Sequence, residues 1–335
     1  MGEFDLIARF FTRPARRAIL GVGDDCALLA LAPGEQMAIS SDMLVEGRHF
    51  YADVDPEALG HKALAVNLSD LAACGAEPRA FTLALALPTA DEAWLAPFAR
   101  GLWALADAHG CELIGGDTTQ GPLNLCITVF GAVPQGQALL RSGARPGDDV
   151  YVSGTPGDAR LALQALRTAR ARAGLPDETG SDPTAIDLPP AALQAMRDRL
   201  ERPTPRNALG VALRGVATAC ADVSDGLAGD LGHILKASRV GATLDAQALL
   251  QATSAPLRAL APALAWRYAA SGGDDYELVF TAPQAQCAAV QAAAQRSVTP
   301  VTRIGRIEPD AGLRWRDPQG QPASPDWRSF DHFSA

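Results

Sequence analysis

Lysine is almost absent from this chain of 335 residues. Only Lys62 and Lys236 are present, so nearly all of the positive charge is carried by arginine. Because no Gly-Lys dipeptide occurs, a Walker phosphate-binding loop, in which lysine follows glycine, is excluded. We attribute the arginine bias itself to genome composition.

The chain also lacks the features of secreted and membrane proteins. Its six cysteines include no C-x-x-C pair, which is typical of reduced thiols. The N-terminal segment is too short and too charged for a signal peptide. The longest apolar runs, such as residues 83–87, are too short to cross a bilayer. We therefore expect a cytoplasmic protein that does not enter a membrane.

Several functional classes are disfavoured by motifs that are missing. No G-x-S-x-G elbow is present, which argues against a hydrolase of the Ser/His/Asp type. The five histidines are dispersed and show no zinc-ligand spacing. A formal net charge of −9, without any basic run, argues against a nucleic-acid partner.

What the chain does have is an ordinary globular composition, with 48% hydrophobic and 20% charged residues. Its length is sufficient for two domains with a sizeable core. Because residues 138–149 are rich in glycine and proline, we place the boundary there. We expect an N-terminal domain over residues 1–140 and a C-terminal domain over residues 147–335. Within the second, a mobile connection rich in Pro, Asp and Thr is expected near residues 174–190.

The stretch from His61 to Pro78 carries the most informative pattern. Its apolar residues recur at three- and four-residue spacing, which predicts a buried helix face, and Asp70 lies inside that run. A carboxylate there is costly to desolvate unless an Arg, a Lys or a metal meets it. Other aspartates make a metal attractive, because they lie beside Gly or Ser near the ends of apolar segments, and we expect them to converge. These are Asp24, Asp25, Asp42, Asp117, Asp222 and Asp225.

The rest of the chain alternates between strand and helix patterns. We expect helices at residues 3–11, 92–109, 157–173, 191–200, 228–238 and 284–296, and strands after Cys26 and at residues 36–40, 80–87, 113–119, 123–133, 150–153, 217–221, 279–281 and 304–307. The strand at 113–119 is expected to end in a Gly-Gly-Asp turn and to pair with 123–133. The helix start near residue 228 should offer unpaired amides to an anion.

Repeated carboxylates next to glycine are typical of sites for hard cations. Magnesium in particular is bound through a few carboxylates together with substrate phosphates. Phosphoryl transfer is therefore the reaction class that this inventory favours, because the protein there mainly positions the reactants and neutralises charge.

Six motifs resemble the thiamine-monophosphate kinase family and occur in that family's order. They are GVGDDCALL at residues 21–29, SSDMLVEGRHF at 40–50, KALAVNLSDLAACGAEP at 62–78, GGDTT at 115–119, DVSDGL with DLGHILKAS at 222–238, and GGDDYELVF at 272–280. The superfamily also holds aminoimidazole ribonucleotide synthetase, selenophosphate synthetase and a hydrogenase-maturation protein. The resemblance implies an α/β (α+β) fold of two domains like that synthetase. In it the N-terminal sheet joins that of a dimer mate in a barrel, and a larger α+β domain follows.

The activity that the resemblance implies is ATP-dependent phosphorylation of thiamine monophosphate to thiamine diphosphate. This is the last step of thiamine diphosphate biosynthesis, and the implied enzyme is a homodimer that uses several Mg²⁺ ions and ATP as co-substrate. The acceptor is a phosphate monoester, already largely dianionic near neutral pH because its second pKa is about 6. It needs no strong general base, so we expect direct in-line transfer without a phospho-enzyme.

The family's site residues are carried over position by position. The implied magnesium ligands are Asp25, Ser40, Ser41, Asp42, Asp70, Asp117, Asp222 and Asp225, of which Asp222 and Asp225 are also the implied catalytic residues. The implied ATP contacts are Gly116, Arg141 and Ser224. The implied substrate contacts are His49, Asp274 and Phe330. Two of these depart from the family: Asp274 replaces the usual Glu and so shortens the reach, and Phe330 replaces a Tyr or Trp.

Two alternatives remain open at this point. Another enzyme of the superfamily would need a reactive cysteine: selenophosphate synthetase near its N-terminus, and a hydrogenase-maturation protein at its C-terminus. Here the first cysteine is Cys26, directly after Asp25, and the chain ends in Phe-Ser-Ala. A non-catalytic nucleotide-binding regulator would not need the complete set of acidic positions.

Overall fold

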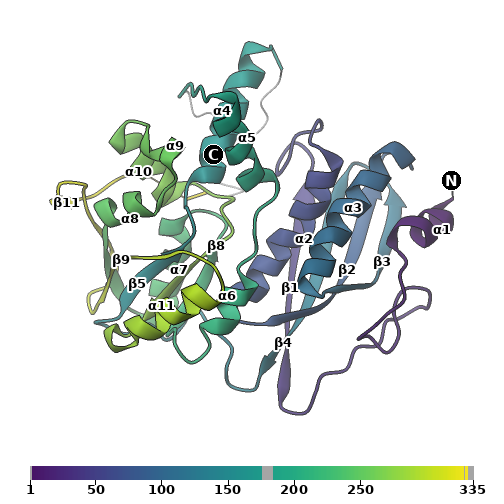
Figure 1. Cartoon of the computed structure of the whole chain (residues 1–335), viewed down its shortest axis with the longest axis horizontal. Helices are drawn as coiled ribbons and strands as arrows, with labels where there is room; N and C mark the ends of the chain where they lie inside the picture. The colour runs from purple at the N-terminus through teal and green to yellow at the C-terminus, as the bar shows by residue number, and fades with distance from the viewer. Residues whose placement is uncertain (1, 176–183, 328, 331–335) are drawn as a thin grey trace. The chain divides into compact units, whose positions relative to one another are not determined.

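The chain divides into two compact units in the computed structural model, which describes residues 2–175, 184–327, 329 and 330 (Figure 1). The first unit contains residues up to 71 and residues 76–136; the second contains residues 72–75 and nearly all of the chain from residue 137 onward. The connection expected near residues 174–190 lies partly outside the described residues. None of the helices in the described ranges is long and apolar enough to span a membrane.

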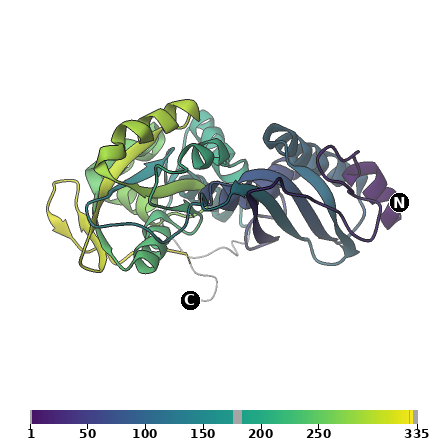
Figure 2. The same cartoon turned by 90° about the horizontal axis from the view of Figure 1, so that it is seen from below.

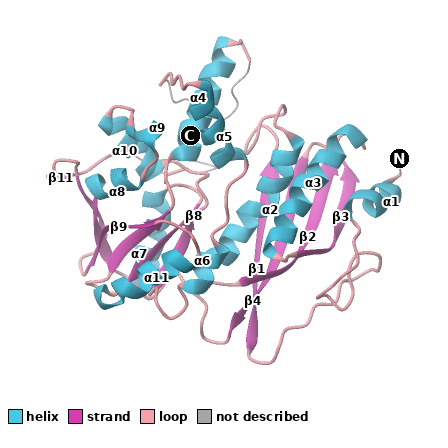
Figure 3. Cartoon of the chain, in the orientation of Figure 1, coloured by secondary structure: helices cyan, strands magenta, loops and turns pink. Residues whose placement is uncertain are grey.

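The first unit is built on a four-stranded sheet (Figure 3). Its helical elements are α1 (Glu3–Leu6), the π-helical turn η1 (Ile7–Phe11), α2 (Pro56–Ala73) and α3 (Glu92–His109). Its strands are β1 (Glu35–Val45), β2 (Glu77–Leu87), β3 (Glu112–Gln120) and β4 (Asn124–Pro134). The strand order is β1-β4-β2-β3, in which only the β2–β3 pair is parallel.

The helices α2 and α3 pack closely because glycine occupies their contact. A Cβ atom on Gly60 would lie 2.0 Å from the carbonyl oxygen of Phe98, and one on Gly101 would lie 1.9 Å from that of Glu57. Leu64, Leu68 and Leu71 on α2 are buried, as the helical spacing in the sequence predicts. The central helix is therefore a core element that also carries Asp70.

The sheet of the first unit is covered on one face. In the described part of the chain, helices lie on one side of the four strands only (Figure 2). Leu125, Ile127 and Val129 alternate along β4 and are buried on that side. On the opposite side of β1, the side chains of Ile39 and Met43 are 62% and 54% exposed.

The second unit is built on a seven-stranded sheet of order β11-β10-β7-β9-β5-β8-β6. The strands are β5 (Asp149–Ser153), β6 (Ala219–Val223), β7 (Gly241–Asp245), β8 (Glu277–Ala282), β9 (Val301–Glu308), β10 (Gly312–Arg316) and β11 (Pro322–Ala323). The helical elements are α4 (Asp158–Arg172), α5 (Pro190–Glu201), α6 (Asn207–Ala212), α7 (Leu227–Ser238), α8 (Ala246–Ala252), α9 (Ala255–Arg258), α10 (Pro262–Ser271), the 3₁₀ turn η2 (Gln284–Gln286) and α11 (Cys287–Arg296).

Both faces of the central strands in this second sheet are buried. Val150 and Val152 of β5 belong to a core formed with α4, α7, α8 and α10. Tyr151, between them in sequence, belongs to a second core formed with α6 and α11. Strands that are buried on both faces have apolar residues at consecutive positions. This is why they were predicted correctly from the sequence.

The structure corrects several sequence-based expectations. The strand expected at 36–40 continues to Val45, so Ser41 and Asp42 lie inside β1. Gly115, Gly116 and Asp117 lie within β3 and do not form a turn. β4 pairs with β1 and β2 instead of β3, because β2 occupies the position between them. The strand expected after Cys26 is not formed: the described residues there make only two isolated bridges, Leu20 with Leu28 and Val22 with Asp24.

Further elements were missed in the second unit. β7, β10, β11, α6, α8, α9 and α10 had no sequence-based prediction, and the strand at 304–307 is followed by two more. The missed strands are short, with at most five residues each, and in β10 only one of the five residues is buried. Short, mixed segments of this kind give a weak periodic signal.

Candidate active site

In the first unit, α2 is bonded to β1 at the Ser-Ser-Asp motif. The Ser40 hydroxyl donates a hydrogen bond to Asp70 Oδ2 at 2.6 Å. The Asp42 amide donates to Asn67 Oδ1 at 2.9 Å, and Asn67 Nδ2 donates to the carbonyl of Ala63 at 3.0 Å. Asn67 and Asp70 are three residues apart and share a helix face. The structure thus brings Ser40, Asp42 and Asp70 together and adds Asn67, which was not predicted.

Ser41 points to the opposite face of the sheet from Ser40. Its hydroxyl lies 2.9 Å from Thr128 Oγ1 and 3.1 Å from the carbonyl oxygen of Ile127, both on β4. Successive side chains of a strand alternate between the two faces of the sheet. The side chains of the two adjacent serines therefore cannot both contact Asp70.

Asp117 lies at the other edge of the same sheet. Asp42 is in register with Ile127, Ile127 with Leu83, and Leu83 with Gly116. Three strand spacings therefore separate the Asp42 and Gly116 backbones, or about 14 Å. Within the first unit, the sheet does not bring Asp117 next to Asp42.

Gly116 has a structural requirement of its own. Its φ is +146°, and a Cβ atom would lie 1.9 Å from the carbonyl oxygen of Leu83. Glycine is thus needed here for strand packing, whatever ligand the backbone meets. Asp25, the remaining acidic position of this unit, lies in an exposed loop where its amide bonds the Asp24 carboxylate at 2.8 Å.

His49 is held in a defined orientation. The Val45 amide donates a hydrogen bond to His49 Nδ1 at 3.0 Å. A neutral imidazole that accepts at Nδ1 carries its proton on Nε2. In its neutral form, His49 therefore carries its proton on Nε2.

In the second unit, the predicted Asp222 lies near the end of β6, and the predicted Ser224 and Asp225 lie in the loop between β6 and α7. Asp222 is buried at the end of β6, and Asp225 is half-buried. The amides of Ser224, Asp225 and Gly226 all donate to Asp230 Oδ2, at 3.1, 3.2 and 3.1 Å. These three amides lie just before the first turn of α7, which begins at Leu227, so the expectation of unpaired amides at the helix start itself stays a prediction.

The environment of Asp230 is unusual for a carboxylate. Its side chain is buried, and burial together with the nearby charge of Asp225 raises its pKa to about 7, although the three amide hydrogen bonds lower it. Desolvation therefore outweighs the hydrogen bonds and the helix dipole.

Asp274 and Phe330 are bonded to this same loop. The Asp274 amide donates to the carbonyl of Ser224 at 2.8 Å, and the Phe330 amide donates to that of Asp225 at 3.0 Å. Asp274 has a φ of +67° and Tyr276 a φ of +50°, left-handed conformations that non-glycine residues rarely adopt. The structure thus places five predicted residues of the second unit in one loop cluster: Asp222, Ser224, Asp225, Asp274 and Phe330.

Two buried carboxylates, on Asp275 and Glu277, are each adjacent in sequence to Tyr276, one of the two residues with a left-handed backbone. Asp275 accepts from the amides of Gly157 and Ala159 at 2.7 and 3.3 Å, and burial raises its pKa well above the ordinary value. Glu277 is fully buried and accepts from Ser153 Oγ at 2.6 Å and from Arg199 and Arg206 at 2.6–2.7 Å. Neither role was predicted, although both residues lie in the GGDDYELVF motif.

Arg141 lies in the second unit on an exposed segment. Ser238 Oγ donates to its carbonyl oxygen at 3.2 Å and accepts from the amides of Gly143 and Ala144, both at 3.1 Å. Ser238, at the end of α7, therefore holds the backbone of Arg141 in place, and Arg141 itself is exposed to solvent.

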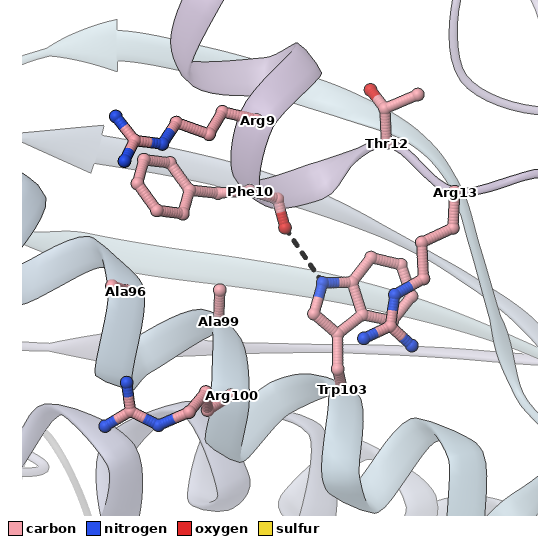
Figure 4. Close-up of a pocket in the computed structure, with 8 residues that line it drawn as sticks. All are labelled: Arg9, Phe10, Thr12, Arg13, Ala96, Ala99, Arg100 and Trp103. Carbon is pink, nitrogen blue, oxygen red and sulfur yellow. Dashed lines mark hydrogen bonds between the residues drawn. The ribbon is translucent and has the colours of Figure 1, made fainter.

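Within the first unit, a pocket of about 270 Å³ lies between the N-terminal segment and α3 (Figure 4). Arg9, Arg13 and Arg100 line it, together with Phe10 and Trp103. Each guanidinium is already paired with an exposed carboxylate of the same unit, on Glu92, Asp107 and Glu57 respectively. Trp103 Nε1 donates to the Phe10 carbonyl at 2.8 Å. The pocket contains no predicted site residue, and its charges are locally balanced.

Within the described residues, no three His, Cys, Asp or Glu side chains are grouped as a ready-made metal centre. The acidic positions instead form small sets in each unit. Magnesium commonly takes only one or two carboxylates from the protein, with the rest of its ligands from water and substrate phosphates.

The fold is that of the AIR synthase related proteins. The model for the AIR synthase related protein, N-terminal domain, matches residues 23–133, and the model for the C-terminal domain matches residues 145–317. Within this class, the chain is 46% identical to a thiamine-monophosphate kinase of Salmonella typhimurium over 99% of this chain and 98% of the relative. It therefore belongs to the thiamine-monophosphate kinase family, and it is a kinase.

Solved structures agree with this assignment. The thiamine-monophosphate kinase of Stenotrophomonas maltophilia K279a superposes with a TM-score of 0.80 at 44% identity, covering 96% of each chain. AaThiL complexed with AMPPCP and TMP superposes with a TM-score of 0.74 at 28% identity, covering 91% of this chain and 89% of that one.

Proposed function

We propose that this enzyme transfers the γ-phosphoryl group of ATP to thiamine monophosphate and forms thiamine diphosphate. The observation that carries the proposal is the loop cluster of the second unit. There the Ser224 and Asp225 backbone, assigned to ATP and metal, is hydrogen-bonded directly to Asp274 and Phe330, assigned to the acceptor. The complex of the relative AaThiL with AMPPCP and TMP supports the same pair of substrates.

The donor set of the proposed magnesium ligands suits the ion. Ser40 and Asp70 present oxygen atoms 2.6 Å apart, and the other ligands proposed in the first unit are Asp25, Ser41, Asp42 and Asp117. The second unit would contribute Asp222 and Asp225. Hard oxygen ligands are those that Mg²⁺ prefers. When bound, several Mg²⁺ ions would screen the repulsion between the two phosphorylated substrates.

The remaining residues orient the two substrates. His49 would donate from Nε2 to a phosphate oxygen, and Arg141 would supply a guanidinium to the nucleotide. The thiazolium of thiamine is a permanent cation, which suits the Asp274 carboxylate and the Phe330 ring. Because the acceptor phosphate is already ionised, direct in-line attack needs positioning and charge neutralisation, with no phosphorylated side chain on the path.

We further propose a cytoplasmic homodimer. The uncovered face of the first unit's sheet carries exposed Ile39 and Met43 on the edge strand β1. Such an apolar face is typical of a protein–protein interface. Joining two such sheets would bury these side chains.

The test is an ADP-release assay with thiamine monophosphate and Mg²⁺, run beside free thiamine and selenide. We expect turnover with thiamine monophosphate alone; no turnover with it would refute the proposal. Asp225→Asn should lower kcat by about 100-fold or more while the protein stays folded, since one charge-stabilising group is lost. Asp198→Asn is the matched control, because Asp198 is exposed on α5 and its carboxylate accepts from the exposed Gln194. Wild-type activity in Asp225→Asn would remove that residue from the mechanism.

A further inference from the structure

Three successive peptide groups of the β6–α7 loop are hydrogen-bonded at both ends. Their N–H groups, on Ser224, Asp225 and Gly226, all point to Asp230 Oδ2. Their carbonyl groups, on Val223, Ser224 and Asp225, accept from the amides of Tyr276, Asp274 and Phe330 at 2.8, 2.8 and 3.0 Å. Each peptide therefore connects the Asp230 carboxylate to one segment on the acceptor side of the site.

In this arrangement one buried oxygen atom, Asp230 Oδ2, holds the three loop peptides and, through them, the segments that contain Asp274, Tyr276 and Phe330. A hydrogen bond at one end of a peptide polarises the other end, so the three chains of bonds reinforce one another. Asp274 and Tyr276 have left-handed backbones, which cost free energy and persist only where the surroundings hold them. Their bonds to the loop are part of that restraint.

Close packing leaves the loop few alternatives. A Cβ atom on Gly226 would lie 2.8 Å from the carbonyl oxygen of Ser271, and one on Gly273 would lie 2.6 Å from that of Ser224. The loop and the segment before β8 thus touch backbone to backbone. A change in the loop conformation would move Asp274 as well as Ser224 and Asp225.

We propose that Asp230 is the positioning residue of this site, acting through the Ser224–Gly226 loop on both substrates. It does not contact the reactants. Its carboxylate accepts from all three amides of the loop and so fixes the backbone that carries the Ser224 and Asp225 side chains. The inference deepens the proposed function and rests on it.

The test compares three variants. Asp230→Ala removes the shared acceptor and leaves the three amides without it. Asp230→Asn keeps one carbonyl oxygen that can accept from all three. Asp245→Ala is the matched control, because Asp245 also accepts from a backbone amide, that of Ala248 at 3.0 Å, at the start of another helix of the same unit.

Two measurements are made on each variant at a temperature where it is folded. Amide hydrogen exchange reports the loop without any need for activity: exchange at Ser224, Asp225 and Gly226 should accelerate in Asp230→Ala and stay slow in the control. Steady-state kinetics should show KM rising for both ATP and thiamine monophosphate. A displacement of about 1 Å lowers kcat/KM by about 100-fold. Asp230→Asn should recover most of this loss.

The outcomes separate the two proposals. Unchanged KM values in folded Asp230→Ala, with only a lower melting temperature, would overturn the positioning role and leave the kinase function intact. Slow exchange at the three amides in that variant would overturn it as well. If the wild-type enzyme has no activity on thiamine monophosphate, the proposed function fails, and accelerated exchange would still support Asp230 as the residue that holds the loop.

Discussion

The sheets of the two units differ in how many of their faces the chain covers. In the second unit, β5 alternates between two cores, with Val150 and Val152 in one and Tyr151 in the other. In the first unit, β4 buries Leu125 and Ile127 on one side, while the other side of the sheet exposes Ile39 and Met43 on β1. The second unit is thus complete within the described chain, whereas the first has a face suited to a partner.

The acidic residues follow the same division. In the second unit, Asp230, Asp275 and Glu277 are buried and serve the protein's own backbone and arginines. In the first, Asp25 and Asp117 are exposed, and the half-buried Asp70 accepts a hydrogen bond from the Ser40 hydroxyl. We infer that substitutions in the first unit mainly change activity, whereas those in the second also change stability.

The largest effect is expected at Asp70. Asp70→Asn keeps an oxygen that can accept from Ser40 but removes the charge proposed to hold magnesium, so kcat/KM should fall by about 1000-fold. The melting temperature should stay near that of the wild type. Asp107→Asn, at an exposed position on α3 of the same unit, is the control. A large loss of stability in Asp70→Asn would contradict the inference that substitutions of acidic residues in the first unit mainly change activity.

The next effect concerns Glu277. Its carboxylate is fully buried between Arg199 and Arg206, so Glu277→Gln leaves two guanidinium groups without their counter-charge. We expect a loss of about 3–5 kcal/mol in the free energy of unfolding, measured by urea denaturation. Asp187→Asn, which breaks the exposed pair with Arg172, should leave the unfolding midpoint unchanged. Equal losses in the free energy of unfolding in the two variants would mean that the stability lost on breaking an ion pair does not depend on its burial.

The uncovered face can be tested by light scattering after size exclusion. Ile39→Lys puts a charge on the apolar face of β1 and should weaken dimerisation by about tenfold or more. Ile19→Lys is the control, because Ile19 is 70% exposed but lies outside the sheet. If Ile39→Lys remains a dimer at the same concentration as the wild type, the interface is elsewhere.

The sequence predicted the parts of the fold that depend on local pattern. α3 begins and ends where its apolar spacing indicated, and the apolar strands β5, β6 and β8 were identified. Pairing order was not predictable in the same way: β4 lies between β1 and β2, which depends on contacts distant in sequence. At the site, the motifs located Asp70 and Asp225, but motif order cannot show that Asp230 turns back to bind three amides.

The smallest effect is a dependence of stability on pH that arises from Asp158. Burial is the main cause that raises its pKa, against the opposing hydrogen bonds from Ser254 and Thr155. Between the unfolded and the folded pKa, the folded state binds more protons than the unfolded one, so this group makes stability fall as pH rises. The Asp158→Asn variant lacks this titratable group and therefore lacks its contribution to the change of stability with pH.

The variant should therefore be less destabilising at pH 7 than at pH 4, as measured by urea unfolding at both pH values. Asp187 provides a comparison of opposite sign, because Arg172 lowers its pKa and its contribution grows as pH rises. That pair is exposed, so solvent screens it and its slope should be weak. If Asp158→Asn costs the same at both pH values, the pKa of Asp158 is the same in the folded and unfolded states. Burial would then not raise the pKa of this carboxyl group, and the contrast between the two units would be weaker.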